Sequence, residues 1–332
     1  MRFVPVLAVV AGIAAMVALV YRLGAAAVLH SLVAIGAVGF ASVCLIHIAL
    51  IAVMGLAWGA LLPEARPWVA VWGRFVRDAG SEVLPLSQVG GFVLGTRAVA
   101  LFGVPATRGV ASTIVDVTLE FVGQLAYIAL GLIWLLHLNA AGVDPRTVVL
   151  GLAGASVLAV AFIVMQRHGV RHAHRIAQVL GRGWAERTAA GATALYQSLD
   201  AIYRRRGGIR VSLLLHFACW IASASEVWVA LYFAGAPLSF GSVMIIESLV
   251  YAIRTTAFFV PNSVGVQEGA YILLGSAFGL SPEMALALSL LKRARDLAIG
   301  LPVLALWQAV EGGRLARRIA AKAPAAPLRG SE

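Results

Sequence analysis

Charge, cysteine and lysine are all scarce in this 332-residue chain. Charged residues make up 12% of the sequence, about half of the share that soluble domains carry, and lysine occurs only at positions 292 and 322. The two cysteines, Cys44 and Cys219, fall inside apolar stretches, where cysteine behaves as a small hydrophobic residue rather than a redox centre. The sequence contains neither a Cys/His spacing typical of a metal site nor a phosphate-binding P-loop, so we expect no metal and no cofactor.

Long apolar runs take the place of the missing charge. Hydrophobic residues make up 61% of the chain, and its mean hydropathy is +0.91. Several runs approach or exceed the roughly 20 residues that a membrane-spanning helix needs. The sequence therefore predicts an all-α polytopic membrane protein, with about six spanning helices plus two broken helical hairpins in an inverted repeat. The predicted spans are 4–21, 33–62, 107–138, 147–165, 210–234 and 282–308.

Arginine placement predicts which loops face the cytoplasm. The formal net charge of +11 comes almost entirely from arginine, which is concentrated in segment 166–208 and in the tail 311–332. Cytoplasmic loops carry an excess of Arg and Lys, so both segments and both chain termini are expected inside a bacterial cytoplasmic membrane. Because the arginines flank apolar spans, the charge favours anionic lipid head groups over nucleic acid as partners.

The two basic segments divide a single integral membrane domain, residues 1–332, into parts. We expect a first repeat half over 33–165, a basic amphipathic connector over 166–208, a second half over 209–310 and a basic cytoplasmic tail over 311–332. Apolar residues recur at helical spacing in the connector. That pattern fits either a helix lying on anionic lipid or a solvated linker.

Two stretches 176 positions apart resemble each other. Each is a Pro-x-Ser break beside glycines, followed by a short apolar segment and then by a long helix with ionisable groups. Proline donates no backbone hydrogen bond and glycine tolerates unusual dihedral angles, so the chain can turn back at each break. Since the flanking charges place the two segments on opposite faces, we expect inverted hairpins. The matched pairs are Pro85 with Pro261, Ser87 with Ser263, Phe102 with Phe278, Gly103 with Gly279, and Glu120 with Asp296.

The two breaks are the predicted substrate site. Paired, Gly/Pro-interrupted segments in the two halves of a membrane protein are a pointer to a transporter's binding site. An arginine after the first break could clamp a phosphate group, or it could simply extend to the cytoplasmic surface. We expect the breaks to face each other across a central cavity. The predicted substrate-binding residues are Pro85, Ser87, Gly90, Gly91, Arg97, Pro261, Ser263, Gly265 and Glu268.

Ionisable residues inside the predicted spans form a second candidate group. Asp116 and Glu120 lie four residues apart on one helix, and Lys292, Arg293, Arg295 and Asp296 lie on the equivalent helix of the second copy. Because a charge at the bilayer centre costs several kcal/mol, such groups pair or serve a function. We expect the two helices to pack together, with the carboxylates against the basic cluster. The network would be structural, or it would line a path for a lipid head group, or one carboxylate would carry a proton.

These motifs resemble a known family. The second copy, SVGVQEGAYILLGSAFGL, looks like the flippase-like integral membrane family of the lysylphosphatidylglycerol synthetase transmembrane region. The first copy is similar to the hopanoid-locus subgroup (HpnL-type), although it has Gly90-Gly91 where many relatives would have Gly-Glu. The resemblance covers about 33–308 and implies that the protein moves or handles a lipid between leaflets.

The sequence is consistent with three functions. The first is a flippase-like transporter of an amphipathic lipid of hopanoid or phospholipid type, acting without catalysis. The second is an intramembrane lipid-modifying enzyme that uses Asp116 and Glu120 as an acid/base pair. The third is a non-catalytic membrane subunit that partners lipid-biosynthesis proteins. We expect no aminoacyl transfer, because the chain ends soon after its last predicted helix and leaves no length for a soluble catalytic domain.

Overall fold

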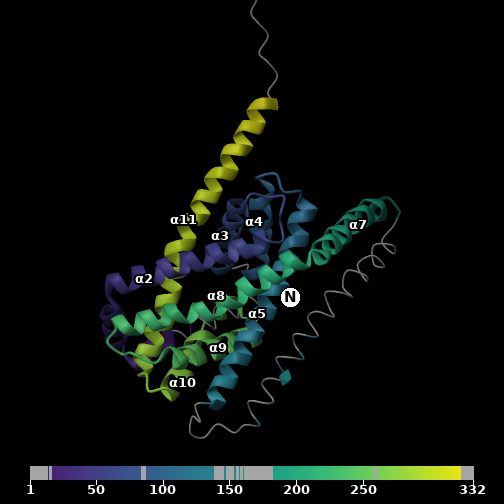
Figure 1. The fold of residues 1–332 in the computed structure, drawn as a ribbon. Coiled ribbons are helices and arrows are strands. Elements are labelled where there is room, and N and C mark those ends of the chain that lie inside the picture. The colour runs from purple at the N-terminus through teal and green to yellow at the C-terminus, as the bar shows by residue number, and fades with distance from the viewer. Residues whose placement is uncertain are drawn as a thin grey trace, which may run out of the picture.

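The computed structural model is all-helical over the residues that it describes (Figure 1). These residues are 14, 17–83, 87–137, 146, 153, 154, 157, 160, 182–257 and 260–322, and side chains are placed for all of them except 87–89, 182–190, 192, 261 and 315–322. The predicted spans 4–21 and 147–165 therefore lie largely outside the described residues. Within those residues the chain forms no strand, in agreement with the predicted all-α class.

The helices fall into two series with the same order of long and short elements. In chain order they are α2 (Ala25–Gly59), α3 (Pro67–Val83), α4 (Ser87–Ala100), α5 (Ala106–His137), α7 (Arg182–Arg204), α8 (Arg206–Phe233), α9 (Phe240–Thr256), the 3₁₀ turn η1 (Pro261–Ser263), α10 (Val266–Ala277) and α11 (Pro282–Lys322). Helices α2, α5 and α8 are long and apolar enough to cross a membrane. The chain is thus a polytopic membrane protein.

The predicted internal repeat is visible in the backbone. Helices α4 and α10 both end in a Schellman turn, in which a glycine with positive φ follows the helix. Gly103 has φ 95° and Gly279 has φ 84°. The amide of Val104 donates to the carbonyl of Val99, and the amide of Leu280, 176 positions later, donates to that of Gly275. The same spacing matches α2, α3, α4 and α5 to α8, α9, α10 and α11.

The matched helices α2 and α8 pack along each other in opposite directions. Gly208 at the start of α8 lies against Ala60 at the end of α2, and Phe233 at the end of α8 lies against Gly39 in the first half of α2. Antiparallel packing of equivalent helices is the arrangement that an inverted repeat requires.

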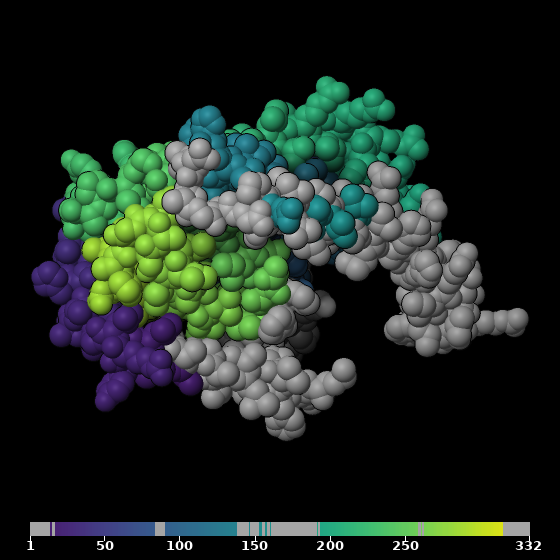
Figure 2. Space-filling view, turned by 90° about the horizontal axis from the view of Figure 1, so that it is seen from below, coloured from purple at the N-terminus to yellow at the C-terminus, as the bar shows by residue number. Residues whose placement is uncertain are grey.

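Each half contributes its last helix to the other half. Helix α5 packs on α8 and α9, and α11 packs on α2 and α3. Figure 2 shows one result of this exchange, since the yellow-green C-terminal helices lie beside the purple N-terminal segment. The buried apolar residues form two main clusters, one centred on α8–α11 and one on the end of α2, the start of α5, and α7.

Two segments show structure that the sequence did not specify. In the connector, the apolar residues Leu199 and Ile202 of α7 are buried in the same cluster as Trp58 and Leu119. This end of α7 therefore docks on protein. In the tail, α11 continues as a helix to Lys322 and extends as a rod beyond the rest of the body (Figure 1).

Candidate functional site

A first buried ion-pair cluster joins α3 to α5. Arg74 binds both carboxylate oxygens of Glu120, at 2.7 and 2.8 Å, and also contacts Asp78 at 2.9 Å. Arg77 lies 2.6 Å from Asp116 and 2.5 Å from Glu120. Asp116, which is fully buried, also lies 2.9 Å from Nε2 of His216 on α8. Both carboxylates that the sequence singled out are thus neutralised by arginines of their own half.

A second cluster joins α11 to the other helices of the second half. Lys292 lies 2.6 Å from Glu247 on α9, and the hydroxyl of Tyr271 donates to the same carboxylate. Arg295 pairs with Glu226 on α8 and with Asp296. Asp116 of the first half and Lys292 of the second are 176 positions apart, so this one pair of equivalent positions carries opposite charges.

The expected packing of α5 against α11, with the carboxylates of α5 against the basic cluster of α11, is wrong. The equivalent helices α5 and α11 lie on different partners, since α5 packs on α8 and α9 and α11 packs on α2 and α3. Each helix therefore finds its counter-charges on nearer elements.

The second break is a strained turn whose polar groups are met by protein. Asn262, Ser263 and Gly265 have φ values of 55°, 48° and 83°, in a region that side chains other than glycine seldom adopt. Glu268, buried at the start of α10, accepts a 2.7 Å hydrogen bond from the Gly265 amide. Arg293 donates to Glu268 at 2.6 Å and to the carbonyl of Asn262 at 3.3 Å. The predicted Glu268 thus holds the break in shape together with Arg293.

The second break contacts the end of α3 across the interface between the halves. The side-chain amide of Asn262 donates to the carbonyl of Glu82, at the end of α3, over 2.5 Å. Arg254 of α9 also reaches the carboxylate of Glu82, at 4.0 Å. The second break and α9 thus both contact the end of α3, and the predicted facing of the two breaks across a central cavity stays a prediction.

Beside this contact lies a small polar cleft between α2, α3 and α11. Its polar lining is His47, Asp78, Glu82 and Asp296, and its walls include Phe75 and Ile299. The volume is about 20 Å³, which is room for about one water molecule. The four polar side chains are between 17% and 27% exposed. Asp78 belongs to the first ion-pair cluster and Asp296 to the second, so both clusters reach the cleft.

Several of the predicted substrate-binding residues do not line the cleft, or lie outside the residues that the structure describes. Pro85 lies outside the described residues, and only the backbone of Ser87 and Pro261 is described. Gly91 is buried where α4 crosses α3, because an added Cβ would lie 2.0 Å from Ser81 Oγ. The remaining residue, Gly90, is partly buried on α4.

Arg97 does not lie beside the first break. It is ten residues beyond Ser87, about 15 Å along the helix at 1.5 Å per residue. Its side chain is 51% exposed and pairs with Glu311 of α11 at 2.5 Å. The expected phosphate clamp at the break is therefore wrong for Arg97, which ties α4 to the C-terminal part of α11.

Sequence reasoning missed Arg74, Arg77 and Asp78. They lie in α3, which carries too many charges to be predicted as a membrane-spanning helix. The charged residues of α3 were therefore not expected to be buried. The available signal was their spacing, because positions 74, 77 and 78 lie on one face of a helix. The histidines His47 and His216, lone residues in apolar helices, each find a carboxylate partner.

Comparison with known proteins agrees with the membrane architecture and the lipid-related resemblance. No curated protein and no solved structure was found to match. Residues 6–303 match the family model described as the lysylphosphatidylglycerol synthase transmembrane region. Since this match covers most of the chain, the protein belongs to the family of the lysylphosphatidylglycerol synthase transmembrane region, whose members are membrane proteins related to lipid handling.

Proposed function

We propose that the protein moves an amphipathic lipid between the leaflets of a bacterial inner membrane, without chemically changing it. The observation that carries the proposal is the polar cleft beside the contact between the second break and the end of α3. The cleft takes groups from both halves of an inverted repeat, and such interfaces hold substrate in transporters built this way. Both termini would lie on the cytoplasmic side.

Electrostatics supports a path for a polar head group at the cleft. Each of Asp78, Glu82 and Asp296 has an arginine partner but remains partly exposed, so each carboxylate can still meet a further donor. Asp116 and Glu268 of the flanking clusters are fully buried. A carboxylate facing hydrocarbon costs several kcal/mol, so partly exposed carboxylates among spanning helices require water or a polar group beside them. Carboxylates accept hydrogen bonds. They therefore suit a head group rich in hydroxyl or ammonium donors, which includes polyol lipids of hopanoid type and phospholipids such as phosphatidylglycerol.

The geometry gives less support to an intramembrane enzyme. Each oxygen of Asp116 already has a partner, Arg77 for one and His216 for the other. Both oxygens of Glu120 accept from Arg74. A general acid or base must come within hydrogen-bond reach of a substrate proton, and these two carboxylates are committed to protein donors. A non-catalytic subunit of a lipid-synthesis complex is the remaining alternative, and the transport assay below separates it.

The proposal is tested with the full chain reconstituted in liposomes that carry a lipid detectable in one leaflet. We expect the lipid to equilibrate between leaflets faster than in protein-free liposomes. The double variant Asp78→Asn with Glu82→Gln should slow this exchange at least tenfold, because it removes two of the cleft's three carboxylate charges. Asp200→Asn is the matched control, since Asp200 pairs with Arg204 on the surface of α7, outside the cleft.

The outcomes distinguish the three functions. Transfer that survives in the double variant would place the path elsewhere. A chemically altered lipid in the same assay would favour the enzyme, and absence of both transfer and conversion would favour the non-catalytic subunit. Mass spectrometry of the extracted lipid reads the conversion directly.

A further inference from the structure

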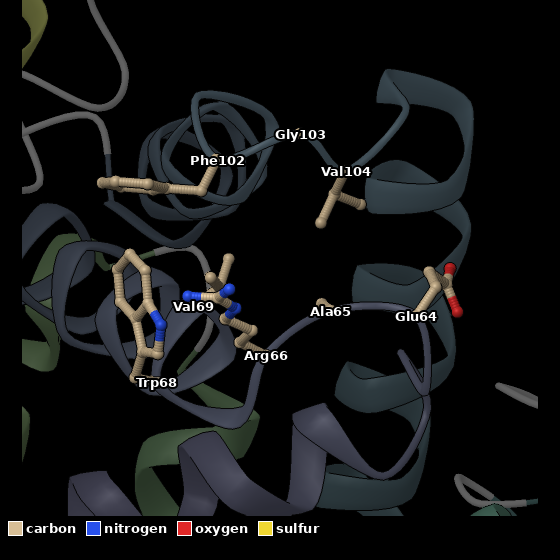
Figure 3. Close-up of a pocket in the computed structure, with 8 residues that line it drawn as sticks. All are labelled: Glu64, Ala65, Arg66, Trp68, Val69, Phe102, Gly103 and Val104. Atoms are coloured by element: carbon tan, nitrogen blue, oxygen red, sulfur yellow. The ribbon is translucent and has the colours of Figure 1, made fainter.

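A larger hollow lies away from the cleft, where two turns of the first half meet. The α2–α3 turn supplies Glu64, Ala65 and Arg66, the start of α3 supplies Trp68 and Val69, and the α4–α5 turn supplies Phe102, Gly103 and Val104. The volume is about 300 Å³. Figure 3 shows the Arg66 side chain reaching in between the two turns, with Trp68 and Phe102 on one side and Val104 pointing in from the other.

The hollow lies at an end of the membrane-spanning helices. Helix α2 ends at Gly59 and α5 begins at Ala106, and both are long and apolar enough to span. The α2–α3 and α4–α5 turns therefore sit where hydrocarbon gives way to head groups. Trp68 is 49% exposed here, and tryptophan at this depth is typical of the membrane–water interface.

The charge around the hollow is positive. Glu64 turns its carboxylate out of the hollow (Figure 3) and pairs with Arg108 at 2.9 Å. Arg66 has no carboxylate partner among the described residues. Arg314 of α11 adds a second cation, lying 4.5 Å from the centre of the Phe102 ring. The Phe102 ring thus contacts both Arg314 and the Trp68 ring, whose centroid is 4.7 Å away in a T-shaped arrangement.

We propose that this hollow binds the phosphate of an anionic phospholipid, with Arg66 on the phosphate and the Trp68 and Phe102 rings against the upper part of the acyl chains. An arginine binds phosphate oxygens through charge-assisted hydrogen bonds. The apolar base of Val69 and Val104 suits a chain-bearing ligand better than a free ion. This lipid is a resident ligand, distinct from the cargo at the cleft.

The second half lacks the equivalent cation. The position 176 residues after Arg66 is Ser242, and the position after Trp68 is Met244, whereas Phe102 is matched by Phe278. The other end of the molecule therefore has the turn and the phenylalanine without the arginine. We infer that the phospholipid is held on one face only.

The test titrates the purified full chain in a neutral detergent with short-chain phosphatidylglycerol, and reads bound lipid by native mass spectrometry and melting temperature. We expect Arg66→Gln to weaken binding about tenfold, in line with the loss of one charge-assisted contact, and Arg66→Lys to retain part of it. Trp68→Ala should also weaken lipid binding without a change of charge. Arg210→Gln is the matched control, because Arg210 is exposed on α8 near the same face, where the start of α8 meets the end of α2.

Two results would overturn the assignment. Equal weakening by Arg66→Gln and Arg210→Gln would mean that diffuse surface charge, not the hollow, attracts the lipid. Inorganic phosphate binding as tightly as phosphatidylglycerol would mean a free-anion site with no use for acyl chains. Neither readout depends on transport, so the site and the proposed lipid movement succeed or fail separately.

Discussion

At the residue scale, the interior depends on a few buried charges with complete sets of partners. Arg77 shows the pattern, because its guanidinium binds two carboxylates and lies 5.7 Å from the ring centres of both Trp58 and Phe92. Such a group is stable only while every partner is present, since a stranded charge in an apolar interior is costly. Small changes here should therefore have large effects.

Asp116→Asn should destabilise the protein strongly. The change leaves Arg77 and His216 without their shared carboxylate, and stranding one partner of a buried pair costs roughly 3–5 kcal/mol. Thermal unfolding in detergent measures the loss. Asp200→Asn is the control, because Asp200 pairs with Arg204 on the surface. If the two variants melt alike, the buried cluster does not stabilise the fold.

Gly91→Ala should separate α3 from α4. A Cβ at this position would lie 2.0 Å from Ser81 Oγ and 2.4 Å from the carbonyl oxygen of Arg77, so backbone must move, at a cost of about 1–3 kcal/mol. Gly269→Ala on α10 meets nothing within 4 Å and should leave the melting temperature unchanged or higher. A harmless Gly91→Ala would contradict the close helix crossing.

At the element scale, the second break is held in shape by a clamp. Arg293 bridges Glu268 and the carbonyls of Asn262 and Ser263. Residues in the left-handed region persist only where surrounding contacts fix them. The clamp therefore controls how readily this turn opens.

Arg293→Gln should loosen the second break without unfolding the helices around it. We expect faster amide hydrogen exchange over 260–266, measured by mass spectrometry, with exchange in α8 unchanged. Arg204→Gln serves as the comparison, since Arg204 lies in α7 and is mostly exposed. Unchanged exchange over 260–266 would show that the contacts of Arg293 are dispensable.

Local backbone features of the fold were predictable from the sequence. Which helices pack together, and which charged residues therefore pair, was not. The match of Gly103 to Gly279 follows from a turn that needs positive φ, which is a property of a few consecutive residues. The partners of Asp116 depend on which helices pack together, and the assumption that equivalent helices α5 and α11 would pair was wrong. The distance between Arg97 and the first break was misjudged, because the sequence does not show that Arg97 lies near the far end of a continuous helix α4.

At the scale of the whole molecule, the antiparallel α2–α8 pair places the matched turns of the two halves at different ends. Membrane orientation follows if the basic segments are cytoplasmic. The α4–α5 turn would then face the cytoplasm, and the α10–α11 turn would face the outside.

Cysteine labelling of the two turns tests this orientation. In a chain with Cys44 and Cys219 replaced by alanine, Ser281→Cys should react with a membrane-impermeant maleimide in intact cells. Ala106→Cys should react only after the membrane is opened. Both positions are exposed, one at each matched turn. Labelling of both from the same side would refute the inverted orientation.

The exchange of last helices between halves has a consequence for membrane insertion. Helix α5 ends at His137 and its packing partner α8 begins at Arg206, about 70 residues later, which is roughly 3–14 s of synthesis at 5–20 residues per second. During that interval Asp116 and Glu120 already have Arg74 and Arg77 from their own half. In the second half Lys292, Arg293 and Arg295 likewise find Glu247, Glu268 and Glu226. Each half can thus enter the bilayer with most of its charge neutralised in cis, and the two histidines, His47 and His216, join the halves afterwards.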